Sequence, residues 1–171
     1  DRYMVIDSST MRNLELTETM REKQKRGSLL WVLDRTKTAM GARMLRSFVE
    51  QPLVDADEID RRLDAVEEFN EKEISCEEMR EYLGPVYDLE RLVTRISYQS
   101  ANPRDMIALK SSLAMLPPIK DLAGSFRAAR LKKLAEELDD LQDIYTLLND
   151  SLVEDPPLAM KEGGIIRDGY N

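Results

Sequence analysis

The chain has 171 residues, of which 42% are hydrophobic and 34% charged, with only 7 glycines and 7 prolines. This composition is typical of a helical protein with solvated faces and excludes a disordered one. The formal net charge of -8 disfavours sequence-independent binding to DNA or to anionic membranes, because each phosphate contact needs a Lys or Arg.

Histidine is absent and cysteine occurs once, at Cys76. Without histidine the chain can build neither a Ser-His-Asp nor a Cys-His catalytic arrangement, nor the common zinc sites. A single cysteine allows no internal disulfide, which fits a reducing compartment, and we expect a cytoplasmic location. The thiol is expected to be unreactive, because Glu77 and Glu78 oppose thiolate formation, although an N-cap at Ser75 would favour it.

No apolar run approaches the roughly 18–20 residues that a membrane span needs, and no signal peptide is visible. The chain begins at Asp1 rather than at methionine. We therefore expect a segment of a longer protein.

The first 27 residues are expected to form an extended and looped lead-in. In YMVIDSSTMRNLEL (3–16), a β-favouring run and a second short extended piece flank a polar turn. Residues 17–27 are charged and predict a surface loop or a frayed helix. The basic cluster of this loop could touch phosphate, but a solvated linker is the favoured interpretation. The cluster comprises Lys23, Lys25 and Arg26.

Helical patterning begins at Ser28 and continues to Pro52. Ser28 is expected to cap a short helix, and Thr38 a second one whose apolar residues recur on one face. Gly41 falls in the first turn of that second helix, where glycine costs about 1 kcal/mol relative to alanine, so we expect another backbone to approach closely. A phosphate loop is excluded, because no GxxxxGK[ST] follows a strand here. The apolar face comprises Met40, Met44, Leu45, Phe48 and Val49.

The next two helices are predicted from capping signals. Asp55 and Glu58 have the spacing of a capping box, and so do Ser75 and Glu78. Each pair precedes apolar residues at helical spacing. We therefore expect one helix to begin after Asp55 and another after Ser75.

Two more helices follow, the first of them over residues 88–100. Asn102 followed by Pro103 is a strong start signal for the second, which is expected to reach about Leu116. The doublet Pro117-Pro118 is expected to stop it. The residues of the 88–100 helix that are expected to face inward are Leu89, Leu92, Val93 and Ile96.

The longest predicted element runs from Ala128 to Leu152. Its apolar residues alternate three and four apart over three heptads, and a continuous helix of this length would reach on the order of 35 Å. Packing along one partner helix is one interpretation; a long strut that transmits movement, or a dimer seam, is the other. The seam comprises Leu131, Leu134, Leu138, Leu141, Tyr145, Leu148 and Leu152.

The tail after Pro156-Pro157 carries Gly-Gly and Asp-Gly dipeptides around a β-branched pair, Ile165-Ile166. Such dipeptides are typical of turns that flank a short strand. Together with the opening run, this predicts an all-α fold, a helical domain with long packed helices and short β segments near both ends.

Adjacent carboxylates are abundant, but neighbours on a helix point about 100° apart and do not converge on a metal or a substrate by themselves. Trp31 and the methionines at 40, 44, 106 and 115 are interpreted as core. We assign no catalytic, cofactor-binding or metal-binding residue. The pairs are Asp57/Glu58, Glu67/Glu68, Glu77/Glu78 and Asp139/Asp140.

Several linked motifs resemble one family. The run MVIDSSTMRNLEL, and then GSLLWVLDRTKTAMGARMLRSFVEQPLVDADEIDRRLDAVEEF, is similar to the central lever (core) domain of bacterial mismatch-recognition proteins of the MutS family. The likeness continues through Asp88-Leu89-Glu90-Arg91, through Asn102-Pro103-Arg104-Asp105 and into the tail KEGGIIRDGYN. It covers nearly all of residues 3–171.

The resemblance implies more than the composition does. Proteins of this family are homodimeric clamps around mismatched DNA, with an N-terminal mismatch-reading domain, a C-terminal domain that binds ATP and Mg²⁺ through a P-loop, and a downstream partner, MutL. The lever joins these ends, and the chain just after DGYN enters an inserted clamp. None of the mismatch or nucleotide motifs lies in this sequence, so no catalytic, cofactor, metal or DNA-contact residue is carried over.

We therefore predict a single domain fragment over 1–171, with a lead-in (1–27), a helical body (28–155) and a β-turn tail (156–171) that leads to the clamp. Its expected function is that of a non-catalytic lever segment in DNA mismatch repair, linking the DNA contacts of other domains to the ATPase domain. One alternative is a stand-alone helical adaptor whose heptad seam binds a partner helix. Another is a nucleic-acid module that uses the basic cluster of 17–27 together with Arg104.

Overall fold

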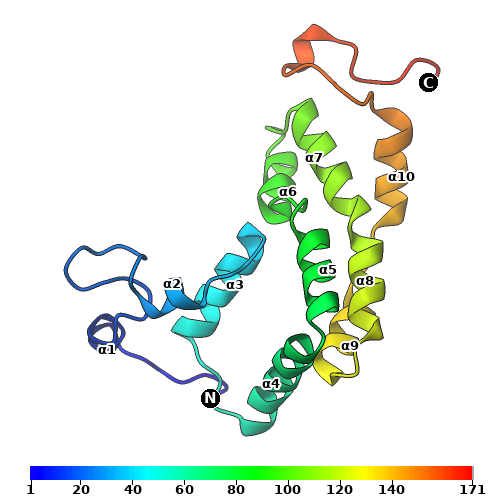
Figure 1. Cartoon of the computed structure of the whole chain (residues 1–171). Coiled ribbons are helices and arrows are strands. Elements are labelled where there is room, and N and C mark those ends of the chain that lie inside the picture. The colour runs from blue at the N-terminus through cyan, green and yellow to red at the C-terminus, as the bar shows by residue number, and fades with distance from the viewer. Residues whose placement is uncertain (171) are drawn as a thin grey trace. The chain divides into compact units, whose positions relative to one another are not determined.

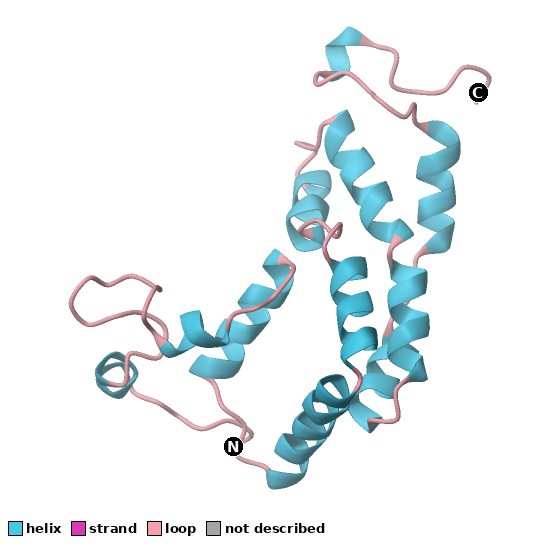
Figure 2. Cartoon of the chain, viewed as in Figure 1, coloured by secondary structure: helices cyan, strands magenta, loops and turns pink. Residues whose placement is uncertain are grey.

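A computed structural model describes residues 1–170. The all-α prediction is confirmed, since Figure 2 shows helices joined by loops and no strand among these residues. The predicted β segments reduce to two isolated antiparallel bridges, Tyr3 with Leu53 and Leu152 with Ile166. The helices, labelled in Figure 1, are α1 (Ser8–Asn13), α2 (Leu29–Leu33), α3 (Ala39–Glu50), α4 (Ala56–Glu71), α5 (Glu73–Leu83), α6 (Leu89–Ser97), α7 (Pro103–Ala114), α8 (Leu116–Ser125), α9 (Ala129–Glu137), α10 (Gln142–Ser151) and a 3-10 turn at Met160–Glu162.

Helices α2, α3 and α7 begin where the sequence places a capping side chain. The Ser28 hydroxyl accepts a backbone N–H three residues on, at 3.2 Å, and the Thr38 hydroxyl does the same at 2.9 Å. Asn102 and Asp105 form a reciprocal capping box, in which each side chain accepts the backbone N–H of the other. These bonds satisfy N–H groups that have no partner inside the helix.

Two helix starts differ from the prediction. The carboxylate of Asp7 accepts the backbone N–H and the hydroxyl of Thr10, at 2.9 and 2.8 Å, and starts the short α1 where a polar turn was expected. Helix α5 begins after Lys72, so Ser75 lies inside it and caps nothing. The chain passes from α4 to α5 across one residue, and the N–H of Cys76 already donates to the Lys72 carbonyl at 2.9 Å.

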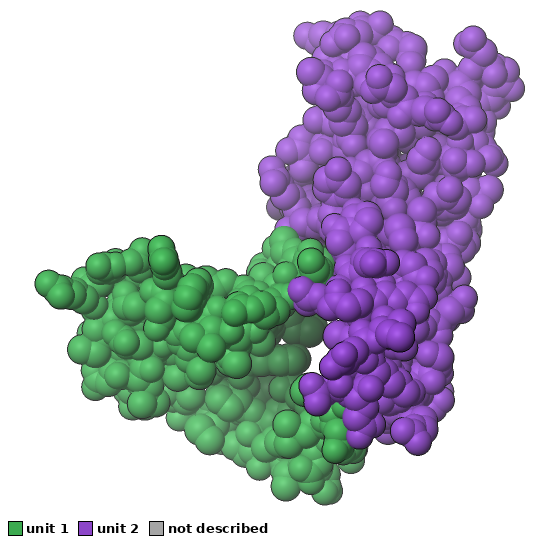
Figure 3. Space-filling model, in the orientation of Figure 1, with its two compact units in different colours: residues 1–67 green, residues 68–171 purple. Residues whose placement is uncertain are grey.

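The chain divides into two compact units, residues 1–67 and residues 68–171, coloured separately in Figure 3. The division falls within α4, whose last residues belong to the second unit.

In the first unit, α2 is held by backbone bonds to the segment that follows α1. The N–H groups of Leu29 and Leu30 donate to the carbonyls of Glu15 and Leu16 at 3.0 and 2.9 Å, and Leu30 is buried. The core expected around Trp31 is not there. The Trp31 side chain is 46% exposed.

Helix α3 buries none of its residues, although the spacing of its apolar face is as predicted. Met44 is 60% exposed, and Phe48 lies 3.8 Å beneath the guanidinium of Arg62. The interpretation of Met44 as core is therefore wrong. An amphipathic pattern indicates which face of a helix can be buried, but it does not show that another part of the chain buries that face.

The second unit has its main core where α6, α7 and α10 meet. The α6 residue Leu92 is buried in it as predicted, and Leu89 packs against it, but Val93 is 55% exposed. The buried members are Leu92, Leu109, Leu113, Leu116, Leu148 and Leu152. A smaller cluster joins α5 to α8 and α9 through Met79, Ala123 and Ala135.

The continuous helix expected from Ala128 to Leu152 is wrong. Helix α9 ends at Glu137 and α10 begins at Gln142. The break follows from Asp139, whose side chain accepts the N–H of Leu141 at 2.9 Å. A local bond of this kind competes with helical bonds.

The proline doublet after α7 has a role that was not expected. Pro117-Pro118 does not only stop α7, because both prolines lie in the first turn of the new helix α8, where no N–H is needed. Helices α7 and α8 are separated only by Met115, which is the C-cap of α7 and the N-cap of α8.

Candidate functional site

The paired carboxylates do not gather into a group that could hold a metal ion in the part of the chain that the structure describes. Among residues 1–170 no group of three or more His, Cys, Asp or Glu side chains could hold a metal ion. Glu58 forms an ion pair with Arg2 at 3.2 Å, and Glu78 accepts the Tyr82 hydroxyl at 2.7 Å, which raises the pKa of Tyr82. The members of these pairs are held by local contacts or face solvent.

Glu68 is the exception, because its side chain is buried at 5% exposure. One carboxylate oxygen accepts the N–H of Arg127 at 2.8 Å and the other accepts the N–H of Ala128 at 2.7 Å. Lys72 forms an ion pair with it at 2.6 Å. Glu68 thus joins the end of α4 to the turn between α8 and α9.

The pKa of Glu68 reflects this setting. Burial on its own would raise the pKa, but the Lys72 ammonium and the two N–H groups outweigh it and hold the pKa at about 2. The carboxylate therefore stays charged in the fold. Next to it, the rings of Phe69 and Phe126 lie 4.7 Å apart, and the Lys72 nitrogen lies 5.2 Å from the centre of the Phe126 ring.

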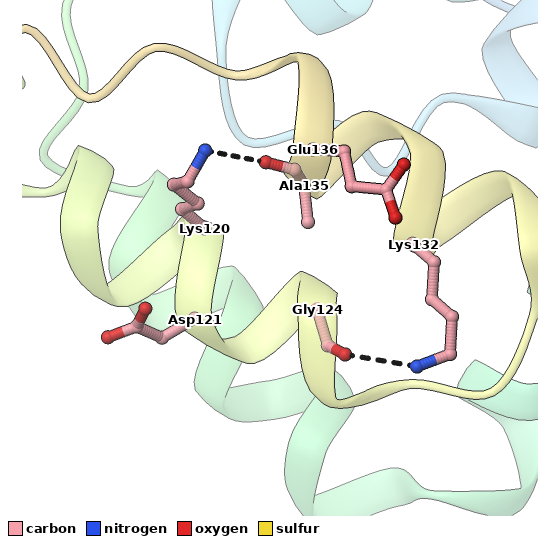
Figure 4. Close-up of a pocket in the computed structure, with 6 residues that line it drawn as sticks. All are labelled: Lys120, Asp121, Gly124, Lys132, Ala135 and Glu136. Carbon is pink, nitrogen blue, oxygen red and sulfur yellow. Dashed lines mark hydrogen bonds between the residues drawn. The ribbon is translucent and has the colours of Figure 1, made fainter.

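A pair of lysines joins α8 to α9, as Figure 4 shows. Lys120 extends from α8 and donates to the carbonyl of Ala135 at 2.8 Å and to that of Leu138. Lys132 extends from α9 in the opposite direction and donates to the carbonyl of Gly124 at 3.4 Å. Each ammonium group thus donates to carbonyl oxygens at the C-terminal end of the other helix, where carbonyls without a helical partner favour a positive charge.

These lysines line a pocket of about 340 Å³ together with Asp121, Gly124 and Glu136. Because both ammonium groups are committed to carbonyl oxygens, the pocket has no unpaired lysine to offer a ligand. What the arrangement can do is hold two helices together. A Cβ added at Gly124 would meet the Ala135 side chain at 3.6 Å, an ordinary contact, so small residues let α8 and α9 approach.

The basic residues singled out in the sequence belong to different units of the described chain. Lys25 is in an ion pair with Asp34, which together with Thr36 lowers the pKa of Asp34 to about 2. Lys23 and Arg26 lie on the same exposed loop of the first unit. Arg104 belongs to α7 in the second unit.

Sequence reasoning missed Glu68, Lys120 and Lys132 as the residues that join helices. Their partners are backbone groups 59 or 60 residues away for Glu68 and 8 to 18 away for the lysines. Every residue type except proline carries the same backbone groups, so the sequence does not show which position will pair with a given side chain. Two signals were available for Glu68: its position on α4, one turn from the core residue Ala65, and a lysine four residues on, at the spacing of a helical ion pair.

Comparison with known proteins gives a consistent result. The family model of MutS domain III matches residues 9–169. The chain is 64% identical over 170 residues to the DNA mismatch repair protein MutS of Lachnoclostridium phytofermentans, covering 99% of this chain and 18% of that protein. It is 53% identical over 171 residues to the DNA mismatch repair protein MutS of Ruminiclostridium cellulolyticum, covering 100% of this chain and 20% of that protein.

A third relative, the DNA mismatch repair protein MutS of Acetivibrio thermocellus, is 52% identical over 171 residues, again with 20% of its length covered. The chain therefore spans about a fifth of the length of the curated relatives it matches. Among residues 1–170, no helix is both long enough and apolar enough to cross a membrane.

Proposed function

Because the chain belongs to the MutS family of DNA mismatch repair proteins, as domain III of that family, we propose that it is a non-catalytic lever segment. In this role it links contacts with mismatched DNA, made by other domains, to an ATPase domain elsewhere in the same polypeptide. The 171 residues act as one segment whose helical body is 28–155 and whose tail, 156–171, leads to the clamp.

The observation that carries the proposal is the set of polar connections within residues 68–170. Glu68 holds the α8–α9 turn, and Lys120 and Lys132 hold the ends of α8 and α9. Packed helices tied at their ends move as a rigid body, and rigid-body movement of this kind can couple distant sites. Position between two sites does not by itself establish coupling, so the proposal needs a functional test.

ATP and Mg²⁺ belong, on this proposal, to residues outside this chain. The residues present do not fit a nucleotide phosphate loop, because the glycine-bearing stretch around Gly41 is the first turn of α3 and its N–H is taken by Thr38. The cytoplasmic location, the homodimeric assembly and the interaction with MutL are likewise proposals that follow from the family.

The test uses the full-length protein that contains this segment. Lys120→Met removes both carbonyl contacts of Lys120 while keeping an unbranched side chain of similar length. Lys133→Met on α9 is the matched control. Lys133 is exposed, and its ion pair with Glu137 is long, at 3.8 Å, and lies on the surface, so it contributes little. Mismatch binding, ATP hydrolysis and ATP-induced release from DNA are measured separately, and the melting temperature shows whether each variant is folded.

We expect Lys120→Met to leave mismatch binding and ATP hydrolysis within about twofold, and to slow ATP-induced release about tenfold, a coupling loss of ordinary size. Lys133→Met should change none of the three. A folded Lys120→Met protein with normal ATP-induced release would contradict the lever role of this connection.

The stand-alone adaptor is less well supported. It relied on a continuous heptad seam, and that seam is interrupted between α9 and α10. Within it, Leu134 is 44% exposed whereas Leu131, Leu148 and Leu152 are buried inside the second unit itself.

A further inference from the structure

A second pocket, of about 330 Å³, lies between α6 and α7 in the second unit. Its charged lining consists of three arginines and two aspartates, and its apolar lining includes Leu92 and Ala108. This excess of positive groups stands out in a chain whose net charge is -8. The charged residues are Arg91, Arg95, Arg104, Asp88 and Asp105.

The Asp105 carboxylate is already engaged. Its Oδ2 accepts the N–H of Asn102 at 2.9 Å as part of the α7 capping box, and it lies 2.9 Å from Nε of Arg95 in an ion pair. Arg95 also donates from Nη2 to the carbonyl of Ser100 at 3.2 Å. Arg95 and Asp105 therefore neutralise each other and form a fixed wall of the pocket.

Arg91 and Arg104 are different. Within residues 1–170, neither guanidinium has a hydrogen bond or an ion pair. The hydrogen bond of Arg91 to Asp88, at 3.3 Å, is donated by its backbone N–H and leaves the side chain unused. Both side chains are exposed. The pocket thus presents two guanidinium groups from two helices, with Asp88 as a second carboxylate of its lining besides the Asp105 that pairs with Arg95.

The chemistry of these groups favours one kind of anion. A carboxylate has two oxygens and one negative charge, which a single guanidinium fork balances. A phosphate monoester has three terminal oxygens and carries about two negative charges at neutral pH, so it can accept from two forks at once and balance both charges. The helix N-termini add little, because the side chains of Asp88 and Asn102 already occupy N–H groups there.

We propose that the pocket between α6 and α7 binds a dianionic phosphate group, held by the guanidinium groups of Arg91 and Arg104. Arg95 is a positioning residue that stays paired with Asp105. This site lies in the second unit and is independent of the lever role, since phosphate could bind here whether or not the segment couples ATP to DNA.

The test follows arginine Nε–Hε signals by NMR in the 171-residue chain of 19.7 kDa, at a concentration where sedimentation velocity shows a monomer. Inorganic phosphate is titrated at pH 7.5, with sodium acetate and sodium chloride at matched ionic strength as comparison salts. We expect the Arg91 and Arg104 signals to shift saturably with phosphate, and not with acetate or chloride.

Variants locate the site. Arg91→Gln and Arg104→Gln should each weaken phosphate binding at least about tenfold, as expected for the loss of a charge-assisted contact. Arg130→Gln on α9, outside the pocket, should leave it within about twofold. Asp88→Asn should tighten binding, because it removes a negative charge at the rim while asparagine remains a good helix cap.

The source of the phosphate is separated with two short DNA duplexes, one carrying 5′-phosphate ends and one with 5′-hydroxyl ends. The proposal expects only the phosphorylated duplex to shift the two signals. Equal shifts from the 5′-hydroxyl duplex would mean that the site contacts backbone diesters, and would overturn the monoester assignment. An absence of saturable shifts with phosphate, or equal shifts with acetate, would overturn the proposal as a whole.

Discussion

The carboxylate of Glu68 uses both of its oxygens, since each accepts a different backbone N–H at the α8–α9 turn. An amide has only one acceptor oxygen, and its NH₂ group would face the remaining N–H donor. A buried donor without a partner costs about 1–3 kcal/mol. The residue therefore fixes the turn through the number of acceptors it offers, as well as through its charge.

We expect Glu68→Gln to lower the free energy of unfolding by about 1–3 kcal/mol, because one N–H at the turn loses its acceptor. Urea denaturation measures this directly. Glu67→Gln is the matched control, since Glu67 is the exposed neighbour on the same helix and should change stability by less than about 0.5 kcal/mol. Equal effects from the two substitutions would contradict the role given to Glu68.

The low pKa of Glu68 also predicts a pH dependence. Its pKa of about 2 in the fold lies below the ordinary value of 4.5. The unfolded chain therefore takes up this proton first as the pH falls, so the contribution of Glu68 is present above pH 4.5 and is lost toward pH 2. Asp34, whose pKa of about 2 lies below its ordinary value of 3.8, loses its contribution as the pH falls from 3.8 toward 2. Stability between pH 5 and pH 2 should fall less steeply in Glu68→Gln than in the parent, as measured by urea denaturation at each pH.

Gly41 is constrained by its own helix cap and not, as expected from the sequence, by another backbone. A Cβ at this position would lie 3.0 Å from the Thr38 hydroxyl oxygen, the atom that accepts the Gly41 N–H, and 3.5 Å from Cβ of Thr36. Any larger residue must push the capping oxygen aside.

A double-mutant cycle checks this assignment. Gly41→Ala should stabilise a Thr38→Ala background by up to about 1 kcal/mol, the usual gain in a helix. In the parent the same change should gain little or destabilise the fold, because the cap is disturbed and a lost cap costs about 1 kcal/mol. Thermal melting of the four proteins gives the coupling between the two positions. A coupling of zero would mean that the contact with Thr38 does not decide the preference for glycine.

At the scale of helices, the break between α9 and α10 is the feature with the largest structural effect. Leu141 has φ 52° and ψ 36°, the left-handed conformation that costs an L residue with a side chain roughly 1–2 kcal/mol. Its side chain nevertheless packs against the main core of the second unit. The Asp139 carboxylate and the Lys120 ammonium hold the intervening turn.

Alanine and glycine substitutions test this break. At Leu141 both remove the same packing, but glycine adopts the left-handed conformation freely, so Leu141→Gly should be more stable than Leu141→Ala by about 1 kcal/mol. At Leu134, inside α9, the order should reverse by a similar amount. Chemical denaturation of the four variants gives both differences. Were the helix continuous through residue 141, alanine would be the more stable at both positions.

The sequence predicts helices here better than it predicts their ends and their burial. The caps at Ser28, Thr38 and Asn102 were correct because each is a bond between residues three apart, which local sequence contains. The seam of leucines crosses the α9–α10 break without interruption, so its periodicity could not reveal the turn. Pro117-Pro118 is compatible with a stop and with a start, and only the packing of α8 decides between them.

At the scale of the whole molecule, apolar exposure is the main property to be explained. In the first unit, α2, α3 and α4 together carry a series of large apolar side chains that are between 37% and 63% exposed. Surfaces of this kind usually mark contacts with other protein surfaces. The residues are Leu29, Trp31, Val32, Leu33, Met44, Phe48, Leu63 and Val66.

We expect the isolated chain to self-associate as its concentration rises, because this apolar surface gains by leaving water. Sedimentation velocity should show the change, and Trp31 gives a second signal, since it is the single tryptophan of the chain and lies in the exposed region. Its fluorescence should become less accessible to iodide with concentration. Leu63→Lys should weaken the effect, whereas Leu147→Lys, on α10 of the second unit, should not. A clean monomer at high concentration would contradict this expectation.

The lysine pair has a consequence for how the chain assembles. The bonds of Lys120 and Lys132 join residues 8 to 18 apart, whereas those of Glu68 join residues 59 and 60 apart. Closing a short loop costs less chain entropy than closing a long one, and local contacts form earlier. The α8–α9 hairpin should therefore be an early kinetic unit during folding, and Glu68 should reach a turn whose two N–H groups already lie side by side.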